Sequence, residues 1–274
     1  MMVLPENFDL QLLLKPVYHS SSGRTTEKRL LRLKMHGISG MITLSKNGEL
    51  EETPMIAFLC ILCLCLAGAF LYVENKEQYV GAVILKGLAS LSFVVLGLLC
   101  SPGTHTAKLI VAGLILGFVA DILLNLRWVV KEKGKLVFLV GILVFLSGHI
   151  VYLAAVLPMA KNRIVCFLTG AVLTAALMKW IFTKITAEKA FKIFGIFYIG
   201  AIMILNCVAI SNLITAPGGF TGLFAAGALL FLISDIVLIL NTFGSETKTS
   251  LRITNIGLYY VGQLLIALSL RFIK

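Results

Sequence analysis

Residues 220–240 read FTGLFAAGALLFLISDIVLIL, and Asp235 is the only ionisable side chain in this run. As an α-helix, a run of this length is roughly 30 Å long, which matches the hydrocarbon core of a membrane. Its apolar residues are continuous and do not alternate with polar ones, as they would in a strand of a membrane barrel. The stretch therefore predicts a transmembrane helix that carries one carboxyl group inside the membrane.

The rest of the chain contains seven more apolar runs of similar length, separated by short polar breaks. The breaks are too short to hold a second domain, and two of them contain Pro-Gly, which is typical of loops. The runs predict an all-α fold, a polytopic transmembrane helix bundle of about eight spans. The expected spans are 55–73, 81–100, 108–126, 136–157, 164–182, 191–213, 220–240 and 253–271.

The composition also favours a membrane protein and excludes two other classes. Of the 274 residues, 59% are hydrophobic and 14% are charged, and the mean hydropathy is +0.98. A soluble domain carries roughly 25% charged residues, and a disordered chain needs low hydrophobicity, so neither class fits. We expect a multi-pass integral membrane protein, located in the plasma membrane if the source is bacterial.

The formal net charge of +11 comes mostly from Lys and Arg in the breaks between the apolar runs. Basic residues in such places orient membrane proteins and contact anionic headgroups, so we expect membrane lipids as partners and no nucleic acid. The breaks after the first, third, fifth and seventh runs are the more basic ones, which favours their side of the membrane as the cytoplasmic side. The sequence carries no signal for an oligomeric state.

Residues 1–53 differ in composition from residues 54–274, which form the predicted eight-span domain. The first segment holds seven Lys or Arg and six Asp or Glu, and it has no apolar run long enough to span a membrane. We expect a polar N-terminal tail that is either disordered or an upstream extension of the reading frame, with Met41 and Met55 as alternative starts. No chemistry is expected in it.

Two of the seven acidic residues after residue 53, Asp121 and Asp235, fall inside predicted spans. An ionised carboxylate in the membrane costs about 2.5–3.5 kcal/mol on insertion scales. Lys86, His149 and Gln263 are also predicted to lie within spans. Because ionisable groups inside a membrane are functional candidates by default, these residues define the candidate site.

The rise of 1.5 Å per residue predicts how deep these groups lie. Lys86, Asp121 and Asp235 are expected roughly 8–11 Å below one membrane face, and His149 and Gln263 nearer the midplane. Helical spacing places further polar side chains on the same helix faces. These neighbours are Asn125, Tyr152, Tyr259 and Tyr260. Ser234 directly precedes Asp235 and can hydrogen-bond the backbone or a partner. The pattern predicts a buried pocket that opens to one leaflet.

Structural roles compete with this interpretation. Lys86 can pair with Asp121 or Asp235 as a buried bridge, and His149 can be a hydrogen-bonded histidine within the bundle. The three cysteines of the first predicted span have no histidine or second cysteine cluster nearby, so they are interpreted as small apolar residues and not as metal ligands.

Five segments carry the polar residues named above: GAVILKGL (81–88), GFVADILLNL (117–126), FLSGHIVYLAA (145–155), GALLFLISDIVLIL (227–240) and YYVGQLLIA (259–267). In this order and spacing they resemble the YhhN-like lysoplasmalogenase family of eight-span membrane hydrolases. Two positions depart from what is common in that family, namely Gly87 after Lys86 and Ala120 before Asp121.

The resemblance implies that a lysophospholipid substrate, a lysoplasmalogen, is hydrolysed at its vinyl-ether bond to a fatty aldehyde and a glycerophospho-base, with no cofactor or metal. This reaction needs an acid that protonates the β-carbon and an anion or base near the resulting cation, in analogy with the paired carboxylates of glycoside hydrolases. Asp121, Asp235 and His149 are the expected catalytic residues. The expected substrate-binding residues are Lys86, Asn125, Tyr152, Ser234, Tyr259, Tyr260 and Gln263.

Three other functions stay open at this point. A transporter of lipids or other amphiphiles would also place polar groups at depth, although it would favour internal repeats and broken helices. A metal-dependent lipid hydrolase would use Asp121, His149 and Asp235 as ligands. A purely structural or binding protein is the third alternative.

Overall fold

The computed structural model describes residues 30–31, 42–43 and 53–273, with the backbone alone at 30–31, 42–43, Thr53 and Ala190. Within the first unit of the chain, Met1–Glu52, the described residues are β1 (Leu30–Leu31) and β2 (Ile42–Thr43), which pair antiparallel. The other residues of the predicted tail lie outside the described residues. The disorder or upstream origin of that tail therefore stays a prediction.

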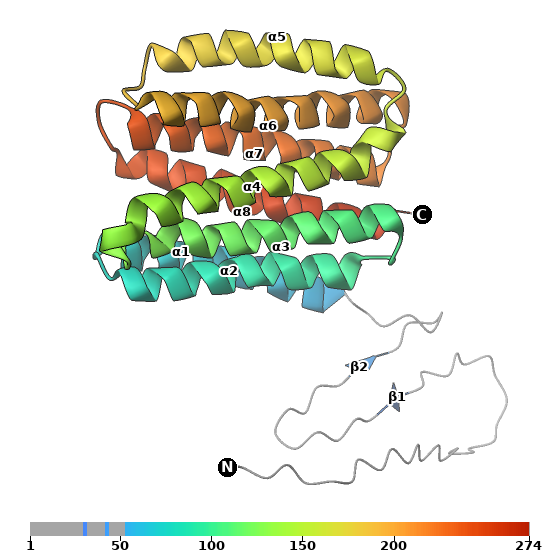
Figure 1. Cartoon of the computed structure of the whole chain (residues 1–274). Helices are drawn as coiled ribbons and strands as arrows, with labels where there is room; N and C mark the ends of the chain where they lie inside the picture. The colour runs from blue at the N-terminus through green and yellow to red at the C-terminus, as the bar shows by residue number, and fades with distance from the viewer. Residues whose placement is uncertain (1–29, 32–41, 44–52, 274) are drawn as a thin grey trace, which may run out of the picture. The chain divides into compact units, whose positions relative to one another are not determined.

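The second unit begins at Thr53 and is built from eight long α-helices, which confirms the predicted all-α fold for the described residues (Figure 1). Three short 3-10 turns, η1 (Lys131–Lys133), η2 (Leu157–Met159) and η3 (Leu270–Phe272), flank α4 and follow α8. The helices are α1 (Thr53–Asn75), α2 (Tyr79–Cys100), α3 (His105–Leu126), α4 (Gly134–Val156), α5 (Arg163–Phe182), α6 (Lys189–Thr215), α7 (Gly219–Phe243) and α8 (Thr249–Ser269).

The helix ends differ from the predicted span ends by at most four residues, and the largest difference is at the start of α8. This helix begins at Thr249, four residues before the apolar run that predicts it. Its polar first turn carries Arg252, whose guanidinium donates two hydrogen bonds of 2.9 and 2.7 Å to the Glu74 carboxylate at the end of α1. Hydropathy marks where the apolar part of a span ends, whereas the helix continues into the polar interface.

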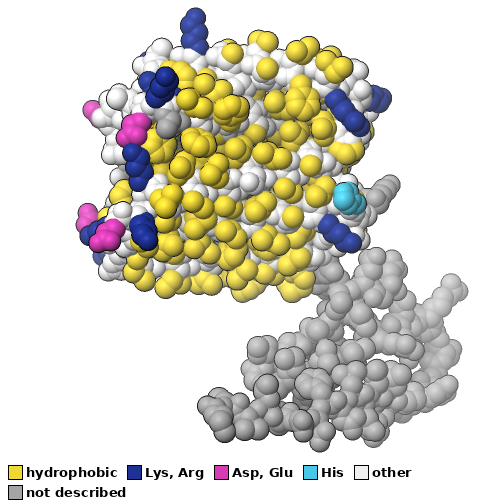
Figure 2. Space-filling model, viewed as in Figure 1, with side chains coloured by type: hydrophobic (Ala, Val, Ile, Leu, Met, Phe, Trp, Pro, Cys, Tyr) yellow, Lys and Arg dark blue, Asp and Glu magenta, His cyan; other side chains and the backbone are white. Residues whose placement is uncertain are grey.

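In the described part of the chain, eight helices are long and apolar enough to cross a membrane, so the protein is a multi-pass integral membrane protein. Its outer surface agrees with this, because large apolar side chains point outward: Ile164 is 76% exposed, Ile214 74% and Val172 68%. Figure 2 shows apolar side chains over the middle of the visible face, while charged side chains gather toward its two ends. The exposed apolar surface is the one that contacts lipid chains.

Helix α8 lies inside the bundle and contacts α1, α2, α3 and α7, whereas α5 packs on α6 at the outer edge (Figure 1). The odd-numbered helices run one way and the even-numbered helices the other (Figure 1). Of the seven connections between them, the four that follow α1, α3, α5 and α7 therefore lie at one end of the bundle, and the other three lie at the opposite end. The polar residues predicted to form the site come from α2, α3, α4, α7 and α8. These helices surround the centre of the bundle.

Two glycines, Gly227 and Gly262, let the backbones of α7 and α8 approach closely, and this contact leads to the first prediction. A Cβ atom added at Gly227 would lie 2.7 Å from the carbonyl oxygen of Gly262. We expect Gly227→Ala to destabilise the protein by about 1–3 kcal/mol, because the two backbones must move apart. The matched control is Gly257→Ala on α8, where an added Cβ would have no neighbour within 4 Å. Thermal unfolding in detergent micelles measures both, and equal midpoints would contradict the prediction.

Candidate active site

Asp121 is the most heavily bonded carboxylate inside the bundle. The ammonium group of Lys86 lies 3.1 Å from Asp121 Oδ1, and both side chains are buried. Ser90 and Tyr259 donate hydrogen bonds of 2.6 and 2.5 Å to Asp121 Oδ2. Lys86 and Ser90 lie four residues apart and share a face of α2, which turns both toward α3. The carboxylate on α3 is thus held by a cation and two hydroxyl groups.

A second set of polar groups extends this network toward the middle of the membrane. Tyr260 OH lies 3.1 Å from Ser90 Oγ and donates a 3.3 Å hydrogen bond to the carbonyl oxygen of Lys86. Gln263 Nε2 donates to Tyr259 OH at 3.4 Å, and Tyr152 OH donates to Gln263 Oε1 at 2.9 Å. The hydrogen bonds therefore join α2, α3, α4 and α8. They fix the orientation of the tyrosine that contacts Asp121.

Asp235 has a different environment on the other side of the centre. Tyr198 on α6 donates a 2.8 Å hydrogen bond to Asp235 Oδ2. His149 Nε2 lies 3.8 Å from the same oxygen, too far for a hydrogen bond. Both ring nitrogens of His149 are buried and have no hydrogen-bond partner among the described residues. The imidazole instead packs edge-on against the ring of Phe231, with 4.6 Å between the ring centroids.

Both aspartates line one small buried cavity, which we call the inner cavity. Its volume is about 40 Å³, enough for a small number of water molecules and too small for a lipid chain. The amide nitrogen Nδ2 of Asn125, also on its wall, is buried without a hydrogen-bond partner in the described part of the chain. Its polar lining residues from within the spans are Lys86, Asp121, Asn125, Asp235, Asn255 and Tyr259.

All ten residues that the sequence singles out are buried in the bundle. Five of them line the inner cavity: Lys86, Asp121, Asn125, Asp235 and Tyr259. The other five lie beside the cavity. Tyr152, Tyr260 and Gln263 belong to the hydrogen-bond network around Asp121, and His149 lies next to Asp235. The Ser234 hydroxyl donates a 3.0 Å hydrogen bond to the carbonyl oxygen of Asn255. The roles assigned to these residues stay predictions.

The sequence analysis did not identify three residues that contact the carboxylates or their neighbours. Ser90 was recognisable, because it follows Lys86 by four residues on one helix face. Tyr198 had no such signal, since a tyrosine in an apolar run is common and the middle of α6 carries no Asp, Glu, Lys, Arg or His. Asn255 pairs with Ser234 through two hydrogen bonds from its side-chain amide, 3.0 and 2.8 Å long. It lies in the polar first part of α8, before the predicted site residues Tyr259, Tyr260 and Gln263.

A larger hollow of about 990 Å³ lies at the end of the bundle where α3 ends and α4 begins, and we call it the vestibule. Arg127, Phe138 and Arg252 line both the vestibule and the inner cavity, so they form the neck between the two. The charged residues that line the vestibule are Glu74, Glu77, Arg127, Lys131, Lys135 and Arg252. The predicted pocket that opens to one end of the bundle thus corresponds to a small inner cavity and a polar vestibule.

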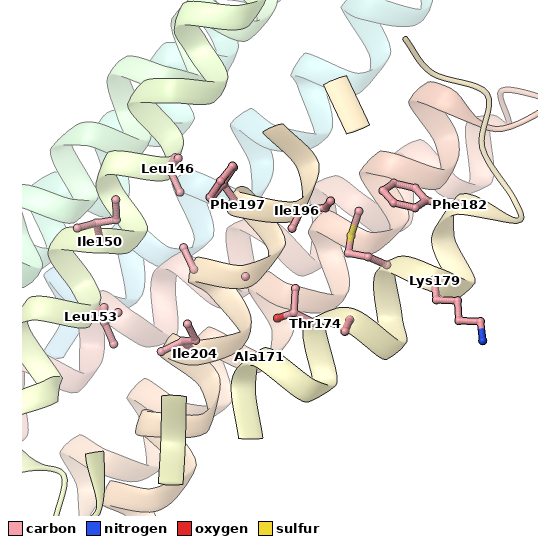
Figure 3. Close-up of a pocket in the computed structure, with 14 residues that line it drawn as sticks. Leu146, Ile150, Leu153, Ala171, Thr174, Lys179, Phe182, Ile196, Phe197 and Ile204 are labelled. Carbon is pink, nitrogen blue, oxygen red and sulfur yellow. The ribbon is translucent and has the colours of Figure 1, made fainter. Parts of the chain in front are cut away.

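A third hollow, of about 840 Å³, lies on the lipid-facing surface among α4, α5 and α6 (Figure 3). Apolar side chains such as Leu146, Ile150, Phe197 and Ile204 line it. The Lys179 side chain at one end points away from it in the close-up. None of the candidate site residues lines this groove.

No three His, Cys, Asp or Glu side chains come together as a metal site in the part of the chain that the structure describes. The alternative in which Asp121, His149 and Asp235 hold a metal ion therefore has no support from the placement of these side chains. The carboxylates are engaged instead by hydroxyl groups and by Lys86.

The fold and the site define a class: a multi-pass membrane protein whose central cavity holds two carboxyl groups within the membrane-spanning region. Residues 81–270 match the YhhN family, and the chain belongs to that family. The match covers α2 to α8 and every candidate site residue. Comparisons with curated proteins and with solved structures gave no match.

Proposed function

We propose that the protein hydrolyses the vinyl-ether bond of lysoplasmalogens, releasing a fatty aldehyde and a glycerophospho-base. The observation that carries this proposal is that Asp121 and Asp235 share one small cavity inside the membrane-spanning bundle. Membership of the YhhN family and the resemblance of the sequence to its lysoplasmalogenases agree with it. A single-chain lipid suits the location, because its apolar chain stays in the membrane while its headgroup stays at the interface.

The surroundings of the two carboxyl groups differ, and this difference indicates which one is the proton donor and which one is the stabilising anion. Asp121 faces an ammonium group and two hydroxyl donors, which together stabilise a negatively charged carboxylate. Asp235 accepts one hydrogen bond, from Tyr198, and no lysine or arginine of the described residues pairs with it. We therefore assign the proton donor to Asp235 and the anion to Asp121.

The reaction would run in two stages. The Asp235 carboxyl proton moves to the β-carbon of the vinyl ether, where the electrons of the C=C bond form the new C–H bond. A lone pair of the ether oxygen then forms a double bond to the α-carbon, and the Asp121 carboxylate stabilises the resulting oxocarbenium ion. Water then adds to the cationic carbon and returns its proton to Asp235. In the hemiacetal formed in this way, the bond to the glycerol oxygen breaks as that oxygen takes the proton back from Asp235, and the hemiacetal hydroxyl gives its own proton to the Asp235 carboxylate. The fatty aldehyde and the glycerophospho-base then leave, and Asp235 is again protonated.

Two neighbours would assist these stages. The free Asn125 amide group on the cavity wall can donate a hydrogen bond to the reacting water or to the ether oxygen. His149 Nε2 lies 3.8 Å from Asp235 Oδ2, so a shift of about 1 Å would bring the two groups within hydrogen-bond distance for the exchange of a proton. Because the inner cavity is too small for the alkenyl chain, entry of the substrate requires side chains at the neck to move.

The test is an assay of the purified protein in detergent micelles with a 1-alkenyl lysophosphatidylethanolamine. We expect one fatty aldehyde per lipid consumed, no product from the 1-alkyl ether with a saturated bond, and unchanged activity after treatment with a chelator. Absence of aldehyde release would overturn the proposal. Movement of intact lipid across liposomes without turnover would favour a transporter instead, and loss of activity with a chelator would favour the metal-dependent alternative.

A further inference from the structure

Arg127 is a positively charged group at the entrance to the site, and it has no anionic partner among the described residues. It caps the C-terminal end of α3, six residues after Asp121, or roughly 9 Å farther along the helix axis. Its side chain makes no ion pair or hydrogen bond with any described residue, and its Nε atom is buried. The other arginine of the neck, Arg252, is bound by the Glu74 carboxylate through two hydrogen bonds.

Aromatic rings hold the Arg127 guanidinium in place. Its central carbon lies 4.7 Å from the ring centroid of Trp128 and 4.2 Å from that of Phe138. These contacts fix the planar group by cation–π attraction but leave its N–H donors unused. The planar guanidinium is thus already oriented to receive a ligand, which lowers the entropic cost of binding one.

The charges around Arg127 favour an anion. Burial and the nearby Arg252 lower the pKa of Arg127 to about 10, so the guanidinium is still protonated at neutral pH. The charge of Glu74 acts on Arg127 in the opposite sense, but this carboxylate is already paired with Arg252. A half-buried cation without a counter-ion costs free energy that a bound anion would recover. Since Lys131 and Lys135 also line the vestibule, its field attracts negative groups.

The position of Arg127 indicates which anion binds. It lines both the vestibule and the inner cavity, so an anion bound there lies between bulk water and the carboxylate pair. In a lysoplasmalogen, the phosphate and the vinyl ether lie at opposite ends of one glycerol unit. A phosphate at the neck would therefore direct the ether toward Asp121 and Asp235. A guanidinium binds phosphate through two parallel hydrogen bonds, a geometry that a lysine cannot offer.

We propose that Arg127 binds the phosphate group of a lysophospholipid at the neck between the vestibule and the inner cavity. This inference rests on the proposed function for the identity of the lipid and extends it to the headgroup. The sequence analysis named Lys86 both as a substrate-binding residue and as a residue that can pair with an aspartate, and its ammonium group is engaged by Asp121 inside the membrane. Arg127 is thereby a substrate-binding residue that recognises the phosphate.

The test compares ligands that differ only in the phosphate. Binding of a non-hydrolysable 1-alkyl lysophosphatidylethanolamine and of the matching 1-alkylglycerol is measured on wild type, Arg127→Gln and Arg127→Lys in micelles. We expect Arg127→Gln to weaken binding of the phospholipid roughly 10- to 100-fold and to leave binding of the alkylglycerol unchanged. Arg127→Lys should lie between, since it keeps the charge and loses the planar fork.

The matched control is Lys133→Gln, which removes an equal charge from an exposed position in the nearby turn η1 that does not line the vestibule, and it should change binding less than threefold. Equal loss for both ligands in Arg127→Gln would overturn the proposal, because it would indicate a packing defect. Unchanged phospholipid binding would overturn it as well. Displacement of the lipid by millimolar inorganic phosphate would show that the site binds free phosphate. That result would contradict the assignment of Arg127 to the lipid headgroup.

This experiment is independent of turnover. If the wild-type protein releases no aldehyde from the alkenyl lipid, the proposed function fails, while the binding of the alkyl analogue still decides the role of Arg127. If aldehyde is released and Arg127→Gln leaves both KM and analogue binding unchanged, only the headgroup site fails.

Discussion

Asp235→Asn is expected to lower kcat for aldehyde release by roughly 10²- to 10⁴-fold, because the amide cannot deliver a proton to the β-carbon. The substitution keeps the shape of the side chain, and Tyr198 can still donate its hydrogen bond to the remaining oxygen. The fold should therefore persist, and the loss should appear in kcat more than in KM. Single-turnover measurements of aldehyde release, together with a thermal unfolding curve, check both parts.

Glu246→Gln makes the same change from carboxyl to amide on an exposed loop, where the side chain is 71% accessible, and serves as the matched control. It should keep the activity of the wild type. Asp121→Asn removes the proposed anion and should also lower kcat by at least 10²-fold. Full activity in both aspartate variants, with both proteins folded, would contradict the assignment of the two carboxyl groups.

Lys86→Met is expected to be strongly destabilising, by about 3–5 kcal/mol, because it leaves the Asp121 carboxylate without its cation inside the bundle. The ion pair is only 6% and 2% exposed at its two side chains, so water cannot replace the ammonium group. Methionine has a similar length, which limits the loss of packing. Denaturant unfolding of the purified protein in mixed micelles measures the change in the free energy of unfolding.

The double variant Lys86→Met with Asp121→Asn separates charge from packing. It removes both charges, so it should recover much of the stability that the single variant loses. Lys135→Met is the matched control, because Lys135 pairs with Glu188 at a position where both side chains are about two-thirds exposed. Its effect should stay within about 1 kcal/mol. Equal losses in Lys86→Met and Lys135→Met would show that the buried pair contributes no more than a surface pair.

The fold was predictable because each span is a continuous apolar run, and a membrane allows few structures for such a run. The start of α8 was the least accurate end, since Arg252 and its neighbours are polar but helical. Depth was also predictable, because the helical rise is constant. For that reason Lys86, Asp121 and Asp235 were expected near one another before their helices were known to be neighbours.

The partners of each carboxylate were not predictable from one sequence. Depth and helix face leave open which neighbouring helix a side chain meets, so the sequence allowed Lys86 to pair with either aspartate. The structure pairs it with Asp121. Tyr198 was missed because its contact with Asp235 depends on how α6 packs against α7, which no local spacing encodes. Arg127 looked like one of many loop cations, and only its burial between two aromatic rings distinguishes it.

The ion pair between α2 and α3 has a consequence for biogenesis. These two helices are neighbours along the chain, so Lys86 and Asp121 can neutralise each other as soon as this hairpin enters the bilayer. Tyr259, which completes the bonds to Asp121, arrives only with the eighth helix. The hairpin of α2 and α3 can therefore remain in the membrane with its two buried charges paired while the remaining spans are synthesised. The candidate site is assembled last, when the final helix inserts between its earlier neighbours.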